Sequence, residues 1–584
     1  MFNSVSSFPF YLKTIVMESN LPRKPFNTLA LSLSGGGYRA ASFHLGLLTY
    51  LSEISWEDTT LLNRVRVIST VSGGTFTGVC YATALASGES LDQCYHKIYN
   101  FMRDVDLAEE GLKNLSDPDS WNSEKKRSLI NAFSLVYFKQ LENNTFAHLF
   151  DHDTHLKEII FNATEFSYGL PFRFQRVQKT NQAFFGNYQV NMPYEALREV
   201  RLADVIAASS CFPMGFEPIN FPNDFRHSQS PVLNNLTESQ QSDMWGKKCK
   251  FPVGLMDGGI VDNQGIDSVL NAEKRMRNYT GELKNSVSDD AKSIDLYVIS
   301  DVSSPFMDSY VRTEEKKLNF FRKLSFNKFK LIGSLSLLLS IAAALLAFYS
   351  GHKWLVFGSG ILSGLFLLGG VVSFLLSSMF GILLKKFDVP EFFRKKVKHF
   401  TGLRFGIYET LISNRLSSVV SMVSEVFMKQ IRRQEYGRAY DDPAWKARLI
   451  TNTIYELTPE HTTYRNHHRK DPLSPELRKT SPALMAAAAK AKSMGTTLWF
   501  TPDELKGDKE NMLDTLIACG QFTTCFNLIE YIEKILRHPD HAEAYQAYPE
   551  ELREKLDALY KKLMSDWETF NKDPYFMVKP RTVK

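Results

Sequence analysis

Three short segments carry the residue types that a serine-based acyl hydrolase needs. Residues 34–39 (SGGGYR) follow an apolar run, Ser72 lies in the segment STVSGG directly after residues 65–68, and Asp257 begins an Asp-Gly-Gly segment after another short apolar run. Ester hydrolysis by a serine requires an exposed hydroxyl, a base that takes its proton and N–H donors for the oxyanion that forms. Each segment supplies one of these three.

Ser72 has the setting of a nucleophile. The β-branched run Val65–Ile68 predicts a strand, and residues 75–85 predict a helix, so the serine stands at a strand-to-helix turn, as in a nucleophile elbow. Two glycines follow it and permit a tight turn. The usual elbow is Gly-x-Ser-x-Gly, whereas Thr70 occupies the first position here. The alternative interpretation is an ordinary strand–Gly-Gly–helix junction.

The segment Gly35–Gly37 is expected to bind an anion. It joins a predicted strand to the predicted helix Ala40–Leu51, and successive glycine N–H groups at a helix N-terminus form an anion-binding nest. Two nucleotide-binding alternatives fit less well. A P-loop needs Lys followed by Ser or Thr, where this chain has Tyr38 and Arg39, and a dinucleotide loop needs glycine at position 40.

Asp257 is the candidate base. It follows the short apolar run 253–256, and the two glycines after it leave its carboxylate accessible to a hydroxyl. No histidine occupies a comparable strand end, and His44, on the helix after the glycine segment, is interpreted as a structural histidine. A serine paired with an aspartate alone requires the two side chains within hydrogen-bond reach.

Together these segments resemble the patatin-like phospholipases, which share a Gly-Gly-Gly-x-Arg/Lys loop, a Gly-x-Ser-x-Gly elbow and an Asp-Gly-Gly/Ala motif. Residues 207–213 (AASSCFP) are similar to the Ala-Ser-Ser-x-x-Pro stretch of the same family, and the resemblance spans roughly residues 28–302. It implies an α/β fold, a three-layer α/β/α sandwich, and no metal or other cofactor. The implied site consists of the catalytic dyad and the oxyanion hole, formed respectively by Ser72 and Asp257 and by Gly35, Gly36, Gly37 and Arg39. Arg39 is expected to stabilise the loop or to attract a phosphate head group.

A membrane hairpin is expected between residues 331 and 384. The only basic side chains there are His352 and Lys353, and the range contains no acidic residue. The twenty residues Leu331–Ser350 suffice to cross a hydrocarbon core of about 30 Å, and Trp354–Leu384 is longer than needed. A buried hairpin of a soluble domain is the alternative, but soluble helices keep a polar face. Gly360 and Gly364 are candidates for close helix packing.

Charge predicts the orientation of this hairpin. Basic residues flank it on both sides, and its turn carries one lysine; the flanking residues are Arg322, Lys323, Lys328 and Lys330 before it and Lys385, Lys386, Arg394, Lys395, Lys396 and Lys398 after it. The positive-inside rule therefore places both flanks in the cytoplasm. The chain is predicted to be an integral membrane protein with a cytoplasmic catalytic domain, in the inner membrane if the source is bacterial.

Composition agrees with a membrane partner. The net charge is +5, much of the basic excess lies beside the hairpin, and no nucleic-acid-binding motif is present. The six cysteines are scattered and indicate reduced thiols in a cytosolic compartment, and none has the spacing of a zinc site. The expected partners are a phospholipid or other lipid ester and the bilayer, without nucleic acid; the oligomeric state is undetermined.

The expected organisation has four parts. Residues 1–27 form a leader, residues 28–320 the catalytic domain with 101–170 as a lid or insertion, residues 331–384 two transmembrane helices, and residues 385–584 a helical part that completes or flanks the catalytic domain. The predicted function is lipid acyl hydrolysis of the phospholipase A or lysophospholipase type. Two alternatives stay open: an acyltransferase, and a catalytically inactive lipid-binding scaffold, which Thr70 alone favours.

Overall fold

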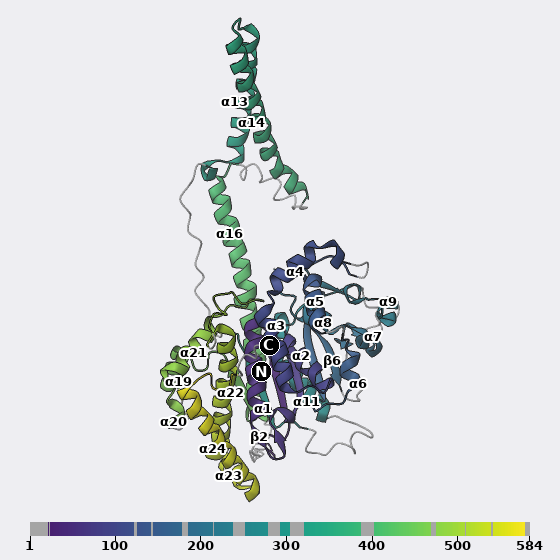
Figure 1. The fold of residues 1–584 in the computed structure, drawn as a ribbon, viewed down its shortest axis with the longest axis vertical. Helices are drawn as coiled ribbons and strands as arrows, with labels where there is room; N and C mark the ends of the chain where they lie inside the picture. The colour runs from purple at the N-terminus through teal and green to yellow at the C-terminus, as the bar shows by residue number, and fades with distance from the viewer. Residues whose placement is uncertain are drawn as a thin grey trace, which may run out of the picture. The chain divides into compact units, whose positions relative to one another are not determined.

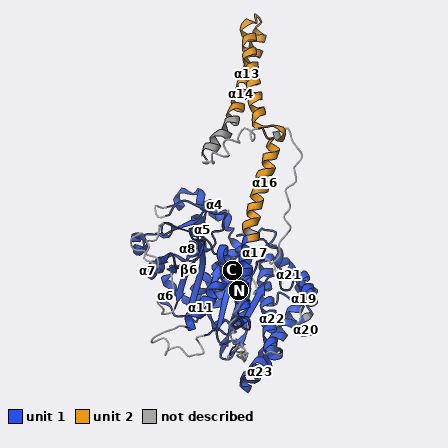
Figure 2. Cartoon of the chain, turned by 180° about the vertical axis from the view of Figure 1, so that it is seen from behind, with its two compact units in different colours: residues 1–306, 427–584 blue, residues 307–426 orange. Residues whose placement is uncertain are grey.

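The computed structural model divides the chain into two compact units, residues 1–306 with 427–584 and residues 307–426 (Figure 2). It describes residues 22, 24–121, 125–141, 144–177, 185–213, 215–236, 252–277, 293–303, 321–386, 402–468, 475–507, 510–538 and 541–578. Most of the expected leader 1–27 and the basic residues 394–398 lie outside this set.

A ten-stranded sheet forms the centre of the first unit. Its order is β12-β11-β1-β4-β5-β6-β7-β8, with β10 paired to β5 and β9 paired to β10. The five strands from β12 to β5 are parallel to one another, and β6 to β10 are antiparallel additions. The strands are β1 (Leu29–Leu33), β4 (Val65–Val71), β5 (Glu158–Glu165), β6 (Leu170–Val177), β7 (Phe185–Gly186), β8 (Asn191–Met192), β9 (Ile219–Phe221), β10 (Val253–Asp257), β11 (Leu296–Asp301) and β12 (Leu449–Thr453), and β2 (Ser55–Trp56) and β3 (Thr59–Thr60) form a separate small sheet.

Helices cover both faces of this sheet, as the expected three-layer sandwich requires (Figure 1). Along β1, Leu29, Leu31 and Leu33 join the larger apolar core, whereas Ala30 joins a smaller core on the other face, because successive strand side chains alternate. The helices of this unit are α1 (Gly37–Glu53), α2 (Gly73–Ala86), α3 (Leu91–Asp104), α4 (Leu107–Ser116), α5 (Leu129–Gln140), α6 (Ala147–Asp151), α7 (Tyr194–Glu199), α8 (Leu202–Ser209), α9 (Pro231–Asn235), α10 (Gly259–Asp262), α11 (Ile266–Arg277), α17 (Met428–Asp441), α18 (Pro443–Lys446), α19 (Pro459–His468), α20 (Pro475–Arg478), α21 (Pro482–Ser493), α22 (Met512–Arg537), α23 (Ala542–Gln546) and α24 (Glu550–Lys572).

Residues 427–584 belong to the same compact unit as residues 1–306. Helix α22 crosses α1 at two glycines: a Cβ on Gly46 would lie 2.1 Å from the Ile517 carbonyl oxygen, and a Cβ on Gly520 would lie 2.0 Å from that of Phe43. The helix backbones therefore touch, which only glycine permits. Helix α22 is apolar and long enough to cross a membrane, as α13 and α14 of the second unit are, but its apolar window is completely buried within the protein.

Strand β5 corrects one expectation. The sequence placed residues 158–165 in an insertion, whereas the structure places them at the centre of the sheet between β4 and β6. All eight residues are buried, although Glu158, Asn162, Thr164 and Glu165 are polar. The segment therefore lacks the apolar alternation that marks a strand in the sequence.

Two strands share one edge of β5. Strand β4 pairs with residues 158–162 and β10 with residues 163–165, while β6 occupies the whole of the other edge. Val71 at the end of β4 is opposite Asn162, and Asp257 at the end of β10 is opposite Ala163. The two strands run in opposite directions, so their C-terminal ends meet, and Ser72 and Asp257 are brought together at that junction.

The second unit contains an apolar helical hairpin of α13 (Phe326–Tyr349) and α14 (Lys353–Lys386), followed by α16 (Phe405–Ser421). Its leucine, isoleucine and phenylalanine side chains are largely exposed, as suits a lipid environment. Small residues form the helix contact: Ser340 and Ser363 exchange hydrogen bonds to each other's carbonyls, and Gly370 lies against Leu337. A Cβ on Gly360 or Gly364 would meet no atom within 4 Å, so the expected contact at these glycines is wrong.

This contact predicts which glycine controls helix pairing. In a chain with Ser340→Cys and Ser363→Cys, oxidation should cross-link α13 to α14. Adding Gly370→Leu should lower the cross-linked fraction, because a side chain there collides with Leu337. Gly364→Leu is the matched control and should leave the fraction unchanged. Equal yields from both variants, measured by protease digestion and gel shift, would contradict the helix contact.

Candidate active site

Ser72 stands on a strained turn between β4 and α2. Its φ of 50° and ψ of −121° are rare for a residue with a side chain. The turn is tight because α2 begins at once, with Gly73 so near the glycine segment that a Cβ there would lie 2.1 Å from the Gly37 carbonyl oxygen. Such geometry presents a serine hydroxyl at the tip of the strand, as an elbow requires.

Ser72 lies beside the Asp257 carboxyl, close enough for its hydroxyl to lower the pKa of that carboxyl. The Gly259 N–H donates to Asp257 Oδ1 over 2.7 Å, and the Asp257 side chain is buried. Burial raises the pKa of Asp257 to about 6, while the Gly259 N–H and the Ser72 hydroxyl lower it. The Asp257 carboxyl therefore titrates close to neutral pH. It is oriented by the Gly259 N–H and lies beside the candidate nucleophile.

Ser209, at the end of α8, holds the Ser72 turn in place through hydrogen bonds. Its hydroxyl donates to the Asn162 carbonyl over 2.6 Å and accepts the Ser72 N–H over 2.9 Å. Since its only proton goes to Asn162, the Thr75 hydroxyl 2.8 Å away must donate to it, and Thr70 in turn donates to Thr75. The sequence pointed to this stretch only by resemblance and gave Ser209 no role. A one-way chain of hydroxyls therefore fixes the backbone N–H of Ser72.

Thr70 fits the turn because Gly78 makes room for it. A Cβ on Gly78 would lie 2.5 Å from the Thr70 Cγ2 methyl, so the helix position opposite Thr70 cannot carry a side chain. The Thr70 hydroxyl is bonded to Thr75 at 2.9 Å. The departure from the usual elbow glycine is thus accommodated by the absence of a side chain at Gly78 in α2.

The glycine segment supplies two available N–H groups. Gly35 N–H donates to the Asn263 carbonyl over 3.0 Å, so its N–H is committed to the fold and not to an oxyanion. Gly36 and Gly37 have φ values of 146° and 59°, and their N–H groups have no hydrogen-bond acceptor among the residues that the structure describes. A Cβ on Gly35 would lie 3.0 Å from Ser72 Cβ, which places the segment directly beside the serine.

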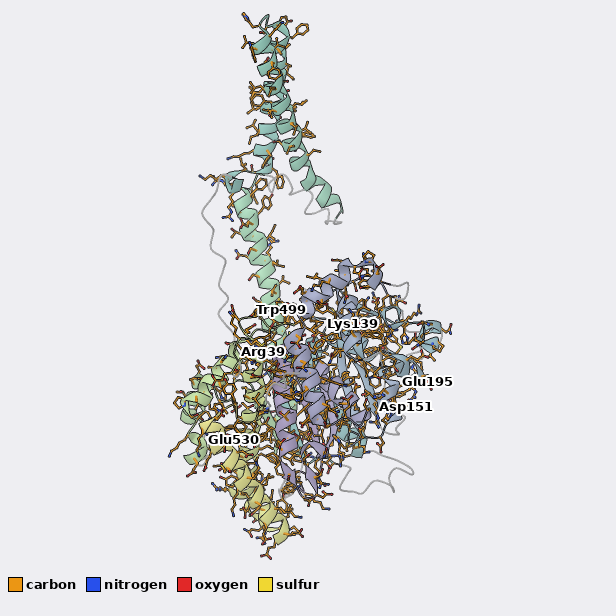
Figure 3. The ribbon with its side chains drawn as sticks, in the orientation of Figure 1. Arg39, Lys139, Asp151, Glu195, Trp499 and Glu530 are labelled. Carbon is orange, nitrogen blue, oxygen red and sulfur yellow. The ribbon has the colours of Figure 1, made fainter. Side chains whose placement is uncertain are left out.

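Residues 494–500 support the glycine segment from the far end of the chain. The Thr497 carbonyl accepts the Tyr38 N–H over 2.9 Å, and the Met494 carbonyl accepts Arg39 Nη1 over 2.8 Å (Figure 3, where Arg39 and Trp499 are labelled). Arg39 is half-buried, and this burial lowers its pKa. Of the two expected roles, the arrangement gives Arg39 that of holding a loop. No sequence signal pointed to residues 494–500.

His44 is a structural histidine, as expected. Its Nε2 lies 2.9 Å from the Ser34 carbonyl, which can only accept, so Nε2 carries the proton and Nδ1 accepts from the Ser300 hydroxyl at 2.9 Å. Burial lowers the pKa of His44 to about 4, so the ring is neutral. Within the described residues, no group of three or more His, Cys, Asp or Glu could hold a metal ion.

One family model matches part of the chain. The family model for patatin-like phospholipases matches residues 31–270, which include Ser72, Asp257 and the glycine segment. Residues 31–270 therefore match a patatin-like phospholipase domain, and we call them the patatin-like domain. The patatin-like domain has the α/β fold that the sequence predicts, with a central, largely parallel sheet between helices.

A solved structure is also similar to the chain. It is the crystal structure of VipD from Legionella pneumophila. The match covers 95% of this chain and 87% of the VipD chain, with 13% sequence identity and a TM-score of 0.24. No curated protein sequence matches the chain.

The packing of Thr70 against Gly78 predicts a rescue. Gly78→Ala should lower the free energy of unfolding by about 1–3 kcal/mol, because the new methyl overpacks against Thr70. Thr70→Ser removes the opposing methyl but keeps the hydroxyl that bonds Thr75, so the double variant should regain most of the loss. Thermal unfolding of the four proteins measures this coupling; strictly additive effects would contradict the contact.

Proposed function

We propose that this chain is a membrane-anchored lipid acyl hydrolase of the phospholipase A or lysophospholipase type, with Ser72 as nucleophile and Asp257 as base. The observation that carries the proposal is that the register of β4 and β10 on β5 places Ser72, at the tip of a strained strand-to-helix turn, beside the buried Asp257 carboxyl. The patatin-like phospholipase domain over residues 31–270 supports the same class of reaction.

Acyl transfer to the enzyme is the first step of the proposed reaction. Ser72 Oγ attacks the acyl carbonyl carbon while Asp257 takes the hydroxyl proton. The negative charge that develops on the carbonyl oxygen is stabilised by the N–H groups of Gly36 and Gly37, which have no competing acceptor among the described residues. The intermediate then expels the lysolipid alkoxide, which Asp257 protonates. The products of this step are an acyl-Ser72 ester and an alcohol.

Deacylation reverses the roles with water. Asp257 takes a proton from water, the hydroxide attacks the acyl carbonyl, and the proton returns to Ser72 as the fatty acid leaves. A base works best when its pKa lies near the operating pH, and burial brings the pKa of Asp257 to about 6. The environment of Asp257 therefore suits a dyad that works without a histidine.

The inactive lipid-binding scaffold stays the alternative from another class. Thr70 is the only sequence feature that favours it, and Gly78 leaves room for the Thr70 side chain beside the turn. Hydrolysis and acyl transfer to an alcohol share the first step and differ in the second. Mass spectrometry of the products from mixed lipids separates them, because hydrolysis releases free fatty acid.

The apolar hairpin of α13 and α14 is the proposed membrane anchor. Both helices are long and apolar enough to cross a bilayer, and their apolar side chains are largely exposed. Basic residues at both ends of the hairpin favour a cytoplasmic location for them and hence for the patatin-like domain. The proposed substrate is therefore a lipid of the membrane that holds the enzyme.

The dyad predicts both a mutational and a pH effect. Ser72→Ala and Asp257→Asn should each lower hydrolysis of a short-chain soluble ester to background. Removing the nucleophile of a serine protease lowers its kcat by a factor on the order of a million, and a loss of similar size is expected here. Asp257 must be ionised to accept the proton, so kcat/KM of the unmodified protein should rise as pH increases through about 6. Stopped assays across pH, with thermal melting as a folding control, measure both.

The result that contradicts the dyad is specific. Substantial turnover by a folded Ser72→Ala protein would remove Ser72 from the mechanism. Thr75→Val is the matched control, since Thr75 lies in the same turn and in the hydroxyl chain but is not assigned to the reaction. Its effect on the rate should be far smaller than that of Ser72→Ala.

The orientation predicts a labelling pattern. A cysteine placed at Gly351, in the turn between the two helices, should react with a membrane-impermeant thiol reagent in intact cells. A cysteine at Glu550, the first residue of α24, should react only after the cells are opened. The reverse pattern would overturn the proposed orientation, and protection of both sites in intact cells would contradict the spanning hairpin.

A further inference from the structure

Two turns of the patatin-like domain expose large aromatic side chains. The turn between β5 and β6 presents Phe166 and Tyr168, whose exposed fractions are 63% and 59%, and the turn between β7 and β8 presents Tyr188 at 46%. Burial of such side chains is the usual outcome in a folded domain. We call residues 166–169 and 187–190 the aromatic turns.

Both aromatic turns lie at the end of the sheet where β4 finishes and Ser72 follows. Strand β5 runs parallel to β4, and Val71 is opposite Asn162, so the next pair along would be Ser72 and Ala163. Phe166 is three residues, or about 10 Å, beyond Ala163 along the chain. Strand β7 runs antiparallel to β6, and Gly186 pairs with Arg173, which is opposite Asn162. The chain therefore leaves β7 at this same edge before it turns into β8.

Side-chain hydrogen bonds hold each turn in place. The buried Glu165 carboxylate accepts the N–H groups of Ser167 and Tyr168 over 2.6 and 2.9 Å. In the other turn, Asn187 Oδ1 accepts the N–H groups of Gln189 and Val190, each over 2.8 Å. Ordered turns that keep aromatic rings in water pay a solvation cost in the isolated protein, which a contact would remove.

The chemistry of the turns favours a lipid surface as that contact. Residues 166–169 (FSYG) and 187–190 (NYQV) contain no charged side chain. Aromatic rings, tyrosine above all, are favoured at the interface between acyl chains and head groups, where the ring is apolar and the hydroxyl stays wet.

We propose that Phe166, Tyr168 and Tyr188 form an interfacial contact by which the patatin-like domain rests on the bilayer with its Ser72 edge at the lipid. The proposal rests on the proposed function, which makes membrane lipid the substrate. It adds a second membrane attachment, separate from the apolar hairpin. The three rings would enter the head-group region, and substrate would reach the site without passing through bulk water.

Depth-dependent quenching tests the contact directly. The full chain, with Cys249→Ser, is reconstituted in vesicles of equal parts phosphatidylethanolamine and phosphatidylglycerol containing lipid with a spin label near the head group. Single Tyr168→Cys, Tyr188→Cys and Tyr464→Cys variants carry an environment-sensitive dye. The five cysteines that the structure describes are buried and do not compete for dye.

Tyr464 is the matched control, because its exposed fraction is 59%, equal to that of Tyr168, and it lies on α19, which follows β12 at the other end of the sheet order. The dyes at positions 168 and 188 should lose most of their emission to the spin label, and the dye at position 464 should not. Equal emission at all three positions would overturn the proposal.

A rate comparison gives the functional consequence. The triple variant Phe166→Ser, Tyr168→Ser, Tyr188→Ser should lower the ratio of vesicle-lipid to soluble-ester hydrolysis by about tenfold, equivalent to about 1.4 kcal/mol. Tyr464→Ser should leave the ratio unchanged. An unchanged ratio in the triple variant would refute the contact as a route to substrate. If the unmodified chain hydrolyses neither substrate, the proposed function fails, while the quenching result still decides whether the turns touch lipid.

Discussion

The candidate site depends on one constraint in the sheet: β4 and β10 share a single edge of β5. Each strand ends where the other ends, so the backbone hydrogen bonds of the ladder, and not the loops, set the separation of Ser72 and Asp257. Strands hold side chains more precisely than loops do. The glycine segment, the hydroxyl of Ser209 and the backbone carbonyl of Asn162 all pack around this junction and keep its backbone in place.

The sequence carried the motifs of the site but not its supports. Ser72, Asp257 and the glycine segment were found because strand–turn–helix patterns and glycines are local signals, and their catalytic roles stay predictions. Ser209 lies 137 residues from Ser72, and Met494 lies 455 residues from Arg39. No local sequence pattern predicts contacts over such separations. Nor did the sequence separate Gly35, whose N–H is used by the fold, from Gly36 and Gly37.

The α/β class was predictable, whereas the place of strand β5 in the sheet was not. Strand β5 is buried but rich in polar residues, so its sequence lacks the apolar pattern of a strand. Its polar side chains have partners in the fold: Glu158 pairs with Arg275, and Asn162 bonds Ser69 and Ser268. Helix α22 has the opposite character. Its composition suits a membrane, yet it fills the catalytic core against α1. Composition alone cannot separate the two environments, because both exclude water.

The place of α22 also fixes when the catalytic unit can be finished during synthesis. Its Gln521 donates to Thr49 across 472 residues, and α1 lies against it through the glycine contacts. At about 5–20 residues per second, a ribosome needs roughly 25–95 seconds between these residues. During that interval the apolar face of α1 has no permanent cover, and the hairpin of α13 and α14 emerges before the cover does. The newly made domain therefore cannot cover this face of α1 until α22 has been synthesised.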